Sequence, residues 1–113
     1  MIWRVDTRRD FEQLRRGARR RSGPLSVTMG PLDAAKPPRV AFAIGRKVGN
    51  APRRNRLRRR LRALMATQSL GLRPATYLLS AQVGAADLSF DQLSSHLGQA
   101  LRALDAIGAE HCG

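Results

Sequence analysis

Residues 45–62 read GRKVGNAPRRNRLRRRLR, and this stretch decides much of the fold because it combines two patterns in one segment. Apolar side chains recur at the spacing of a helix face, at Leu57 and Leu61 and then, just past the stretch, at Leu64 and Met65. Basic side chains fill most of the other positions, and the stretch contains no acid. We therefore predict a packed helix that carries its positive charge on an exposed side, not a disordered basic tail.

The positive charge of this helix is concentrated opposite its apolar side. Successive helical residues are about 100° apart, which places a set we call the outward row away from the leucines: Asn55, Arg58, Arg59 and Arg62. Arg53 and Arg54 flank the apolar arc and are expected to reach phosphate from its edges, or to cover apolar surface with their methylene stems.

A solvated helix face is the alternative explanation for such a charge run. Solvated faces usually mix signs, because like charges four residues apart cost about 0.2–0.5 kcal/mol per pair. Here Arg54 with Arg58 and Arg58 with Arg62 are repulsive pairs that no acid balances. We therefore interpret the outward row as a polyphosphate-binding surface. Asn55 alone would be an ordinary exposed residue, but within this row its amide could contact a base edge or a 2′-hydroxyl.

The flanks of the helix predict how the chain enters and leaves it. Asn50 or Ala51 is expected to cap the helix, Pro52 suits its first turn, and the pattern ends near Ala66. Before it, residues 40–45 alternate between bulky and very small side chains.

This alternation predicts a strand with one bulky face and one nearly bare face. Val40, Phe42 and Ile44 form the bulky face, while Ala41, Ala43 and Gly45 lie on the other. A bare sheet face favours a ligand or a closely packed helix.

The rest of the chain predicts one domain, residues 1–113, with the order α-β-β-α-β-α. A capping-box pattern begins a short helix over 7–17, in which Phe11, Leu14 and Ala18 share a face. Strands are expected at 25–29 and 75–81, and a loop is expected from Gly30 to Pro38. A last leucine-rich helix begins at the capping box of Ser89 and ends at Gly108. The expected fold class is α+β, a small sheet covered by helices.

The composition indicates an anionic partner, and the sequence shows no residues grouped for catalysis by the chain itself. The 113 residues carry a formal net charge of +13, which favours nucleic acid. No apolar run is long enough to cross a bilayer and no secretory signal is evident, so a cytoplasmic location is expected. Cys112 lacks a disulfide partner, and with His111 it makes a poor metal site at the chain end. Because no carboxylates or Cys/His residues cluster, we predict neither catalytic nor metal-ligating residues.

The sequence resembles the protein component of bacterial ribonuclease P. The resemblance rests on the RNR signature Arg54-Asn55-Arg56 followed by Leu57-Arg58-Arg59 and Arg62, and on the approach Gly45–Ala51. Arg4-Val5, Asp10-Phe11, Gly17, the strand at Val40, Tyr77–Leu79 and the last leucine helix also follow the family's order. The likeness spans nearly the whole chain.

The resemblance implies a two-layer sandwich with a left-handed β-α-β crossover around the basic helix. It also implies a subunit that binds ribonuclease P RNA and the 5′ leader of precursor tRNA, and assists Mg²⁺-dependent removal of that leader. Catalysis would reside in the RNA, which would hold most of the Mg²⁺, with one protein expected per RNA and no membrane. The implied RNA-binding residues are the RNR helix, Arg54, Asn55, Arg56, Arg58, Arg59 and Arg62, with Arg46 on the approach to it, and the central cleft, Phe11, Ala43 and Lys47.

Some positions depart from the family pattern. Arg15 and Thr28 stand where aromatic residues can occur, which implies weaker stacking on the leader, and Ala43 replaces a common serine. Pro52 stands where an aliphatic residue is usual and Gln82 where arginine is frequent. Two other classes of function are possible: a structural RNA-binding protein such as a ribosomal component, and a DNA-binding protein. The sequence shows no recognisable dimerisation element of the kind that DNA binding through a basic helix uses.

Overall fold

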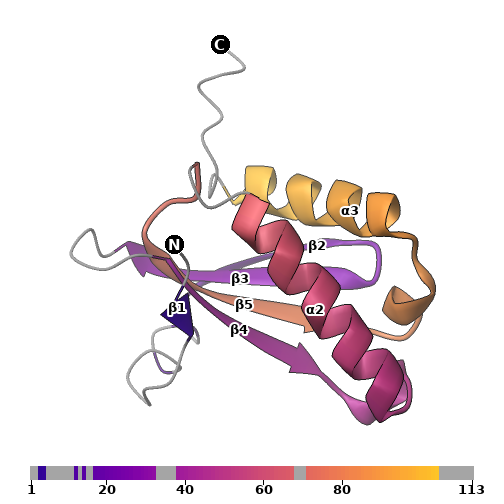
Figure 1. Cartoon of the computed structure of the whole chain (residues 1–113). Coiled ribbons are helices and arrows are strands. Elements are labelled where there is room, and N and C mark those ends of the chain that lie inside the picture. The colour runs from indigo at the N-terminus through magenta and orange to yellow at the C-terminus, as the bar shows by residue number, and fades with distance from the viewer. Residues whose placement is uncertain are drawn as a thin grey trace.

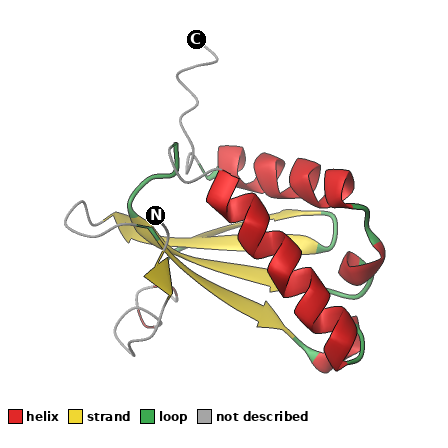
Figure 2. Ribbon diagram, viewed as in Figure 1, coloured by secondary structure: helices red, strands yellow, loops and turns green. Residues whose placement is uncertain are grey.

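The computed structural model describes residues 3–4, 12, 14, 17–32, 38–67 and 71–104. Two helices, α2 (Ala51–Thr67) and α3 (Phe90–Ala103), lie on the same side of a twisted sheet (Figure 1). The colouring by secondary structure in Figure 2 shows the same two layers. The two-layer α+β class predicted from the sequence is confirmed.

The sheet has five strands in the order β1-β4-β5-β3-β2. Their bounds are β1 Trp3–Arg4, β2 Ala18–Ser22, β3 Leu25–Leu32, β4 Arg39–Ile44 and β5 Ala75–Ala81. Two 3₁₀ turns, η1 (Arg46–Val48) and η2 (Ala85–Asp87), precede α2 and α3 respectively. The pairs β1/β4 and β4/β5 are parallel, whereas β5/β3 and β3/β2 are antiparallel.

The connection from β4 through α2 to β5 has the rarer hand. In Figure 1 α2 lies in front of the sheet, both strands run towards the right of the view, and β5 lies above β4. A helix in front of strands in that arrangement makes a left-handed crossover, against the strong right-handed preference of parallel units. The hand implied by the family resemblance is therefore confirmed.

The core lies between the sheet and the two helices, and the predicted patterns account for it. All four apolar residues of α2 are buried: Leu57, Leu61, Leu64 and Met65. In α3 the leucines at 93, 97 and 101 are buried. Both hydrogen bonds of the capping box form: the Ser89 Oγ accepts from the Gln92 backbone N–H, and the Gln92 Oε1 accepts from the Ser89 backbone N–H. α3 ends at Ala103, earlier than expected, and Gly108 lies outside the described residues.

Strand β4 shows the predicted alternation. Val40 and Ile44 are buried in the core and Phe42 packs against it, whereas Ala43 is exposed on the opposite face. The predicted strand 75–81 coincides with β5. The side of the sheet that α2 and α3 leave uncovered is called the open face below.

Strands β1 and β2 were not predicted, and Ala18, assigned to the first helix, is instead the first residue of β2. The sequence of β2, ARRRS, has no apolar alternation that could have predicted a strand. This edge strand forms because its backbone pairs with β3. Glu12 and Leu14 are helical, while the other residues of the expected helix before Gly17, Phe11 among them, lie outside the described residues.

Strand β3 continues through Gly30 and Pro31, where the sequence predicted a loop. Its pairing with β2 stops at Met29, and its register with β5 shifts between Met29 and Leu32. A proline is tolerated there because its missing N–H removes no regular ladder hydrogen bond.

Candidate nucleic-acid interface

The basic helix begins at a well-defined cap. The Asn50 side-chain Oδ1 accepts a hydrogen bond from the backbone N–H of Arg53 at 3.1 Å, and the Asn50 carbonyl accepts from the N–H of Arg54 at 2.9 Å. Asn50, one of the two predicted candidates, is therefore the N-cap. The first turn of α2 contains no acid, so the positive end of the helix dipole adds to the charge of its arginines.

The outward row lies on the flank of α2 that adjoins β4. The Arg62 guanidinium carbon lies 5.7 Å from the centre of the Phe42 ring, within the range of a cation–π contact. Arg58 donates a hydrogen bond from Nη1 to the Asn55 Oδ1 at 2.9 Å. The Asn55 oxygen is thus engaged within the helix, which leaves the amide N–H groups of Asn55 as its outward-facing donors.

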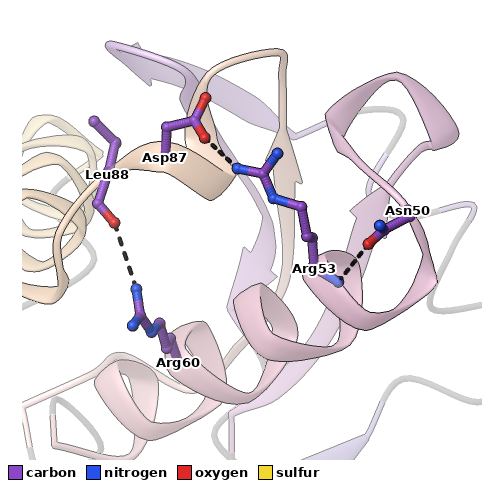
Figure 3. Close-up of polar contacts among 5 residues, drawn as sticks. All are labelled: Asn50, Arg53, Arg60, Asp87 and Leu88. Atoms are coloured by element: carbon purple, nitrogen blue, oxygen red, sulfur yellow. Dashed lines mark hydrogen bonds and ion pairs between the residues drawn. The ribbon is translucent and has the colours of Figure 1, made fainter.

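The opposite flank of α2 is tied to the rest of the protein. Arg53 forms an ion pair with Asp87 of η2, and the Arg60 Nη1 donates to the Leu88 carbonyl at 3.4 Å (Figure 3). Arg54 is half-buried, and its Nε is buried with no hydrogen-bond partner. The sequence predicted that Arg53 and Arg54 either reach phosphate or cover apolar surface with their methylene stems. The half-buried Arg54 is consistent with the second role. Arg53 instead contacts the carboxylate of Asp87.

Two of the exposed arginines of α2 have no partner among the described residues. Arg56 and Arg59 are both exposed, and no hydrogen bond or ion pair engages either within the part of the chain that the structure describes. Arg53 and Arg60 are therefore tied to the η2 segment, whereas Arg56 and Arg59 are left exposed.

The turn η1 brings two more cations to the same end of the molecule. Arg46 and Lys47 are exposed, and they line a pocket of about 640 Å³ together with Gly45, Val48 and residues 81–83. This pocket lies where the parallel strands β4 and β5 end, directly before the N-terminus of α2. Ends of parallel strands are common ligand sites in sheets of this kind.

The predicted site residues are thus partly brought together. Ala43, Arg46, Lys47 and the RNR helix are contributed by one continuous unit, β4–η1–α2. Phe11, predicted for the same cleft, lies outside the described residues. A second exposed basic segment, not predicted as part of the site, lies on β2 and consists of Arg19, Arg20 and Arg21. The run of three consecutive arginines without a neighbouring acid could have identified this segment from the sequence as a second basic surface.

The described ranges contain no group of three or more His, Cys, Asp or Glu residues placed to hold a metal ion. Among the helices in these ranges, none is both long enough and apolar enough to span a membrane. The site consists of cationic and amide donors, which bind phosphate and base edges.

The parallel strands β4 and β5 are joined by a left-handed crossover, and the crossover helix α2 carries the exposed arginines. These features define a small, basic α+β protein with an exposed cationic surface. The chain belongs to the ribonuclease P protein family, whose model matches residues 2–105. It is therefore a protein subunit of ribonuclease P, the endoribonuclease of tRNA 5′ processing, and it associates with ribonuclease P RNA. Membership of this family replaces the ribosomal and DNA-binding alternatives.

Named relatives and solved structures agree with this assignment. The chain is 40% identical over 111 residues to the ribonuclease P protein component of Thermobifida fusca, covering 89% of this chain and 75% of the relative. It is 34% identical to that of Streptomyces avermitilis, covering 94% of each. The fold matches the RNase P protein of Staphylococcus aureus with a TM-score of 0.83 at 18% identity, over 94% of this chain and 98% of the other. The Thermotoga maritima protein gives 0.73 at 20% identity, with the same coverage.

Proposed function

We propose that this subunit holds the 5′ leader of precursor tRNA along β4, where the outward row of α2 on one side of the strand and the open face on the other can both reach it, next to ribonuclease P RNA. The observation that carries the proposal is the convergence on β4–η1–α2 of exposed cations and a bare strand face. The outward row lies beside β4, where Arg62 contacts Phe42, and the exposed Ala43 leaves room for a strand to approach the sheet.

The protein's part in the reaction is electrostatic and positional. Arg56, Arg59 and Lys47 are exposed and can neutralise phosphates where the leader and the catalytic RNA approach one another. Neutralising these charges lowers the repulsion that bulk Mg²⁺ would otherwise have to screen. No side chain in the proposed site is suited to act as a nucleophile or general base, so cleavage is assigned to the RNA.

Mg²⁺ would supply the charge stabilisation of the cleavage step in the holoenzyme. The described residues bring no acidic cluster to the basic surface, so this proposal assigns the ion to the RNA and gives the protein no ligand. One protein per RNA, acting in the cytoplasm, completes the proposal. The mass of the reconstituted particle tests the stoichiometry.

Reconstitution with a ribonuclease P RNA tests the proposal directly. Cleavage of precursor tRNA is measured across a magnesium titration, with and without the protein, and binding of precursor is compared with binding of mature tRNA. The protein should shift the titration to lower Mg²⁺ and should favour the precursor. Equal affinity of the holoenzyme for both RNAs would contradict a leader site.

A further inference from the structure

Two rows of residues cross the open face of the sheet from β4 to β2. The strand registers place Ala43 beside Ser80, Ser80 beside Ser26, and Ser26 beside Arg21. A parallel row follows one step along the strands: Ala41, Leu78, Thr28 and Arg19. Neighbours in register point to the same face, so each row starts at a small side chain on β4 and ends at an arginine on β2.

The first row is shallow along its length. Alanine and two serines are its members before Arg21, and neither α2 nor α3 covers this side of the sheet (Figure 1). Ala43 is exposed, Ser80 is half-buried, and Ser26 is 1% exposed. The Arg19 Nη2 donates a hydrogen bond to the Ser26 Oγ at 3.1 Å, so the Arg19 side chain lies inward over the row.

The arginines of β2 differ in the face to which they belong. Arg19 and Arg21 pair with Thr28 and Ser26 of the open face, whereas Arg20 pairs with Val27, which is buried in the core on the helix side. All three are exposed, and within the described part of the chain their guanidinium groups bond only neutral oxygens. The Arg20 Nη1 donates to the Arg19 carbonyl at 2.8 Å, and the Arg21 Nε donates to the Gly23 carbonyl at 3.0 Å. No acid within the described residues pairs with any of them.

Protection of an exposed sheet edge is the simpler explanation for charge on β2, because charged side chains discourage pairing with another chain. That explanation requires charge along the edge but no particular face. It does not account for Arg19 being directed inward onto Ser26, at the end of a row of small residues. Three strand spacings separate β4 from β2, so this second basic edge lies about 14 Å from β4.

We propose that Arg19 and Arg21 form a second phosphate-binding site, which holds a distal part of the leader after it has crossed the open face. The inference rests on the proposed leader site at β4 and extends it across the sheet. The leader enters beside Ala43 and Lys47, passes over Ser80, and its backbone reaches the two guanidinium groups on β2. These contacts are to phosphate, so they favour longer leaders without favouring a base sequence.

The test uses the reconstituted holoenzyme and a set of precursor tRNAs whose leaders are lengthened one nucleotide at a time. Affinity of the unaltered protein should rise in steps until the leader reaches β2. The double variant Arg19→Gln/Arg21→Gln should bind short leaders normally and long leaders roughly fivefold to thirtyfold more weakly. Its log-log salt slope for long leaders should be shallower by about 1.4. The matched control, Arg20→Gln, lies on the same strand but on the other face.

The outcomes separate this inference from the proposed function. If the unaltered holoenzyme does not respond to the leader at all, the proposed function fails first. If it responds but the double variant behaves like the unaltered protein, only the second site is refuted. An equal loss in Arg20→Gln, or a loss that persists with leaderless tRNA, would also overturn it, by indicating general charge or a contact with ribonuclease P RNA. Thermal melts of the free proteins show whether the variants remain folded.

Discussion

Substituting Arg59 tests whether the outward row contacts phosphate. Arg59 is exposed on α2 and has no partner among the described residues, so Arg59→Gln should remove an RNA contact and leave the fold unchanged. The neighbouring Arg60 supplies the control. It carries the same charge on the same helix, but its guanidinium bonds the Leu88 carbonyl at 3.4 Å.

The magnitude follows from counterion release. Each phosphate contact contributes about 0.7 to 0.9 to the slope of log affinity against log salt. Loss of the Arg59 contact should therefore make the slope shallower by that amount. Over a fourfold rise in salt, the variant should lose about threefold less affinity than the unaltered protein.

The assay is a salt titration of holoenzyme assembly and precursor binding for both variants. Arg60→Gln should keep the unaltered slope and should lower the free energy of unfolding by about 0.5 kcal/mol, because its hydrogen bond is long. If the two variants change the slope equally, the assignment of the two flanks of α2 is wrong. If Arg59→Gln keeps the full slope, the outward row does not carry the phosphate contacts.

Four further predictions concern stability. Gly17→Ala should lower the free energy of unfolding in urea by about 1–3 kcal/mol, because a Cβ at residue 17 would lie 2.1 Å from the Met29 carbonyl oxygen. The control Gly71→Ala should be nearly neutral, because a Cβ at residue 71 meets nothing within 4 Å. Leu61→Ala should cost about 2.7–5 kcal/mol, since Leu61 is fully buried; a smaller loss would show that the α2 core can collapse around the cavity. Burial raises the pKa of Tyr77 above its usual value of about 10, so the unfolded chain loses the phenol proton before the folded protein does as the pH rises. The free energy of unfolding should therefore fall by about 1.4 kcal/mol per pH unit above pH 10. The variant Tyr77→Phe should not show this fall. Sulfate should raise the melting temperature more than chloride at equal ionic strength, because the unpaired arginines of α2 repel one another without an anion; equal melting temperatures would contradict this.

The elements that could be predicted from the sequence are those with local causes. The helix α2 follows from its apolar period and the Asn50 cap, and α3 from its capping box, because helical hydrogen bonds and caps join residues close in sequence. The alternation in β4 also identified the bare strand face before its neighbours were known. The RNR signature within α2 identified the family, which the comparisons confirm.

The tertiary structure decided what depends on partners distant in sequence. β2 has no apolar pattern and exists because β3 pairs with it, so its arginines were missed. The helix pattern placed Arg53 at the edge of the apolar arc, but only the packing of η2 against α2 showed that Asp87 engages Arg53 and that the Leu88 carbonyl engages Arg60. The two rows that end at Arg19 and Arg21 require the register of four strands. Periodicity fixed which side of an element is buried, and the sheet's non-local hydrogen bonds determined which exposed charges lie together.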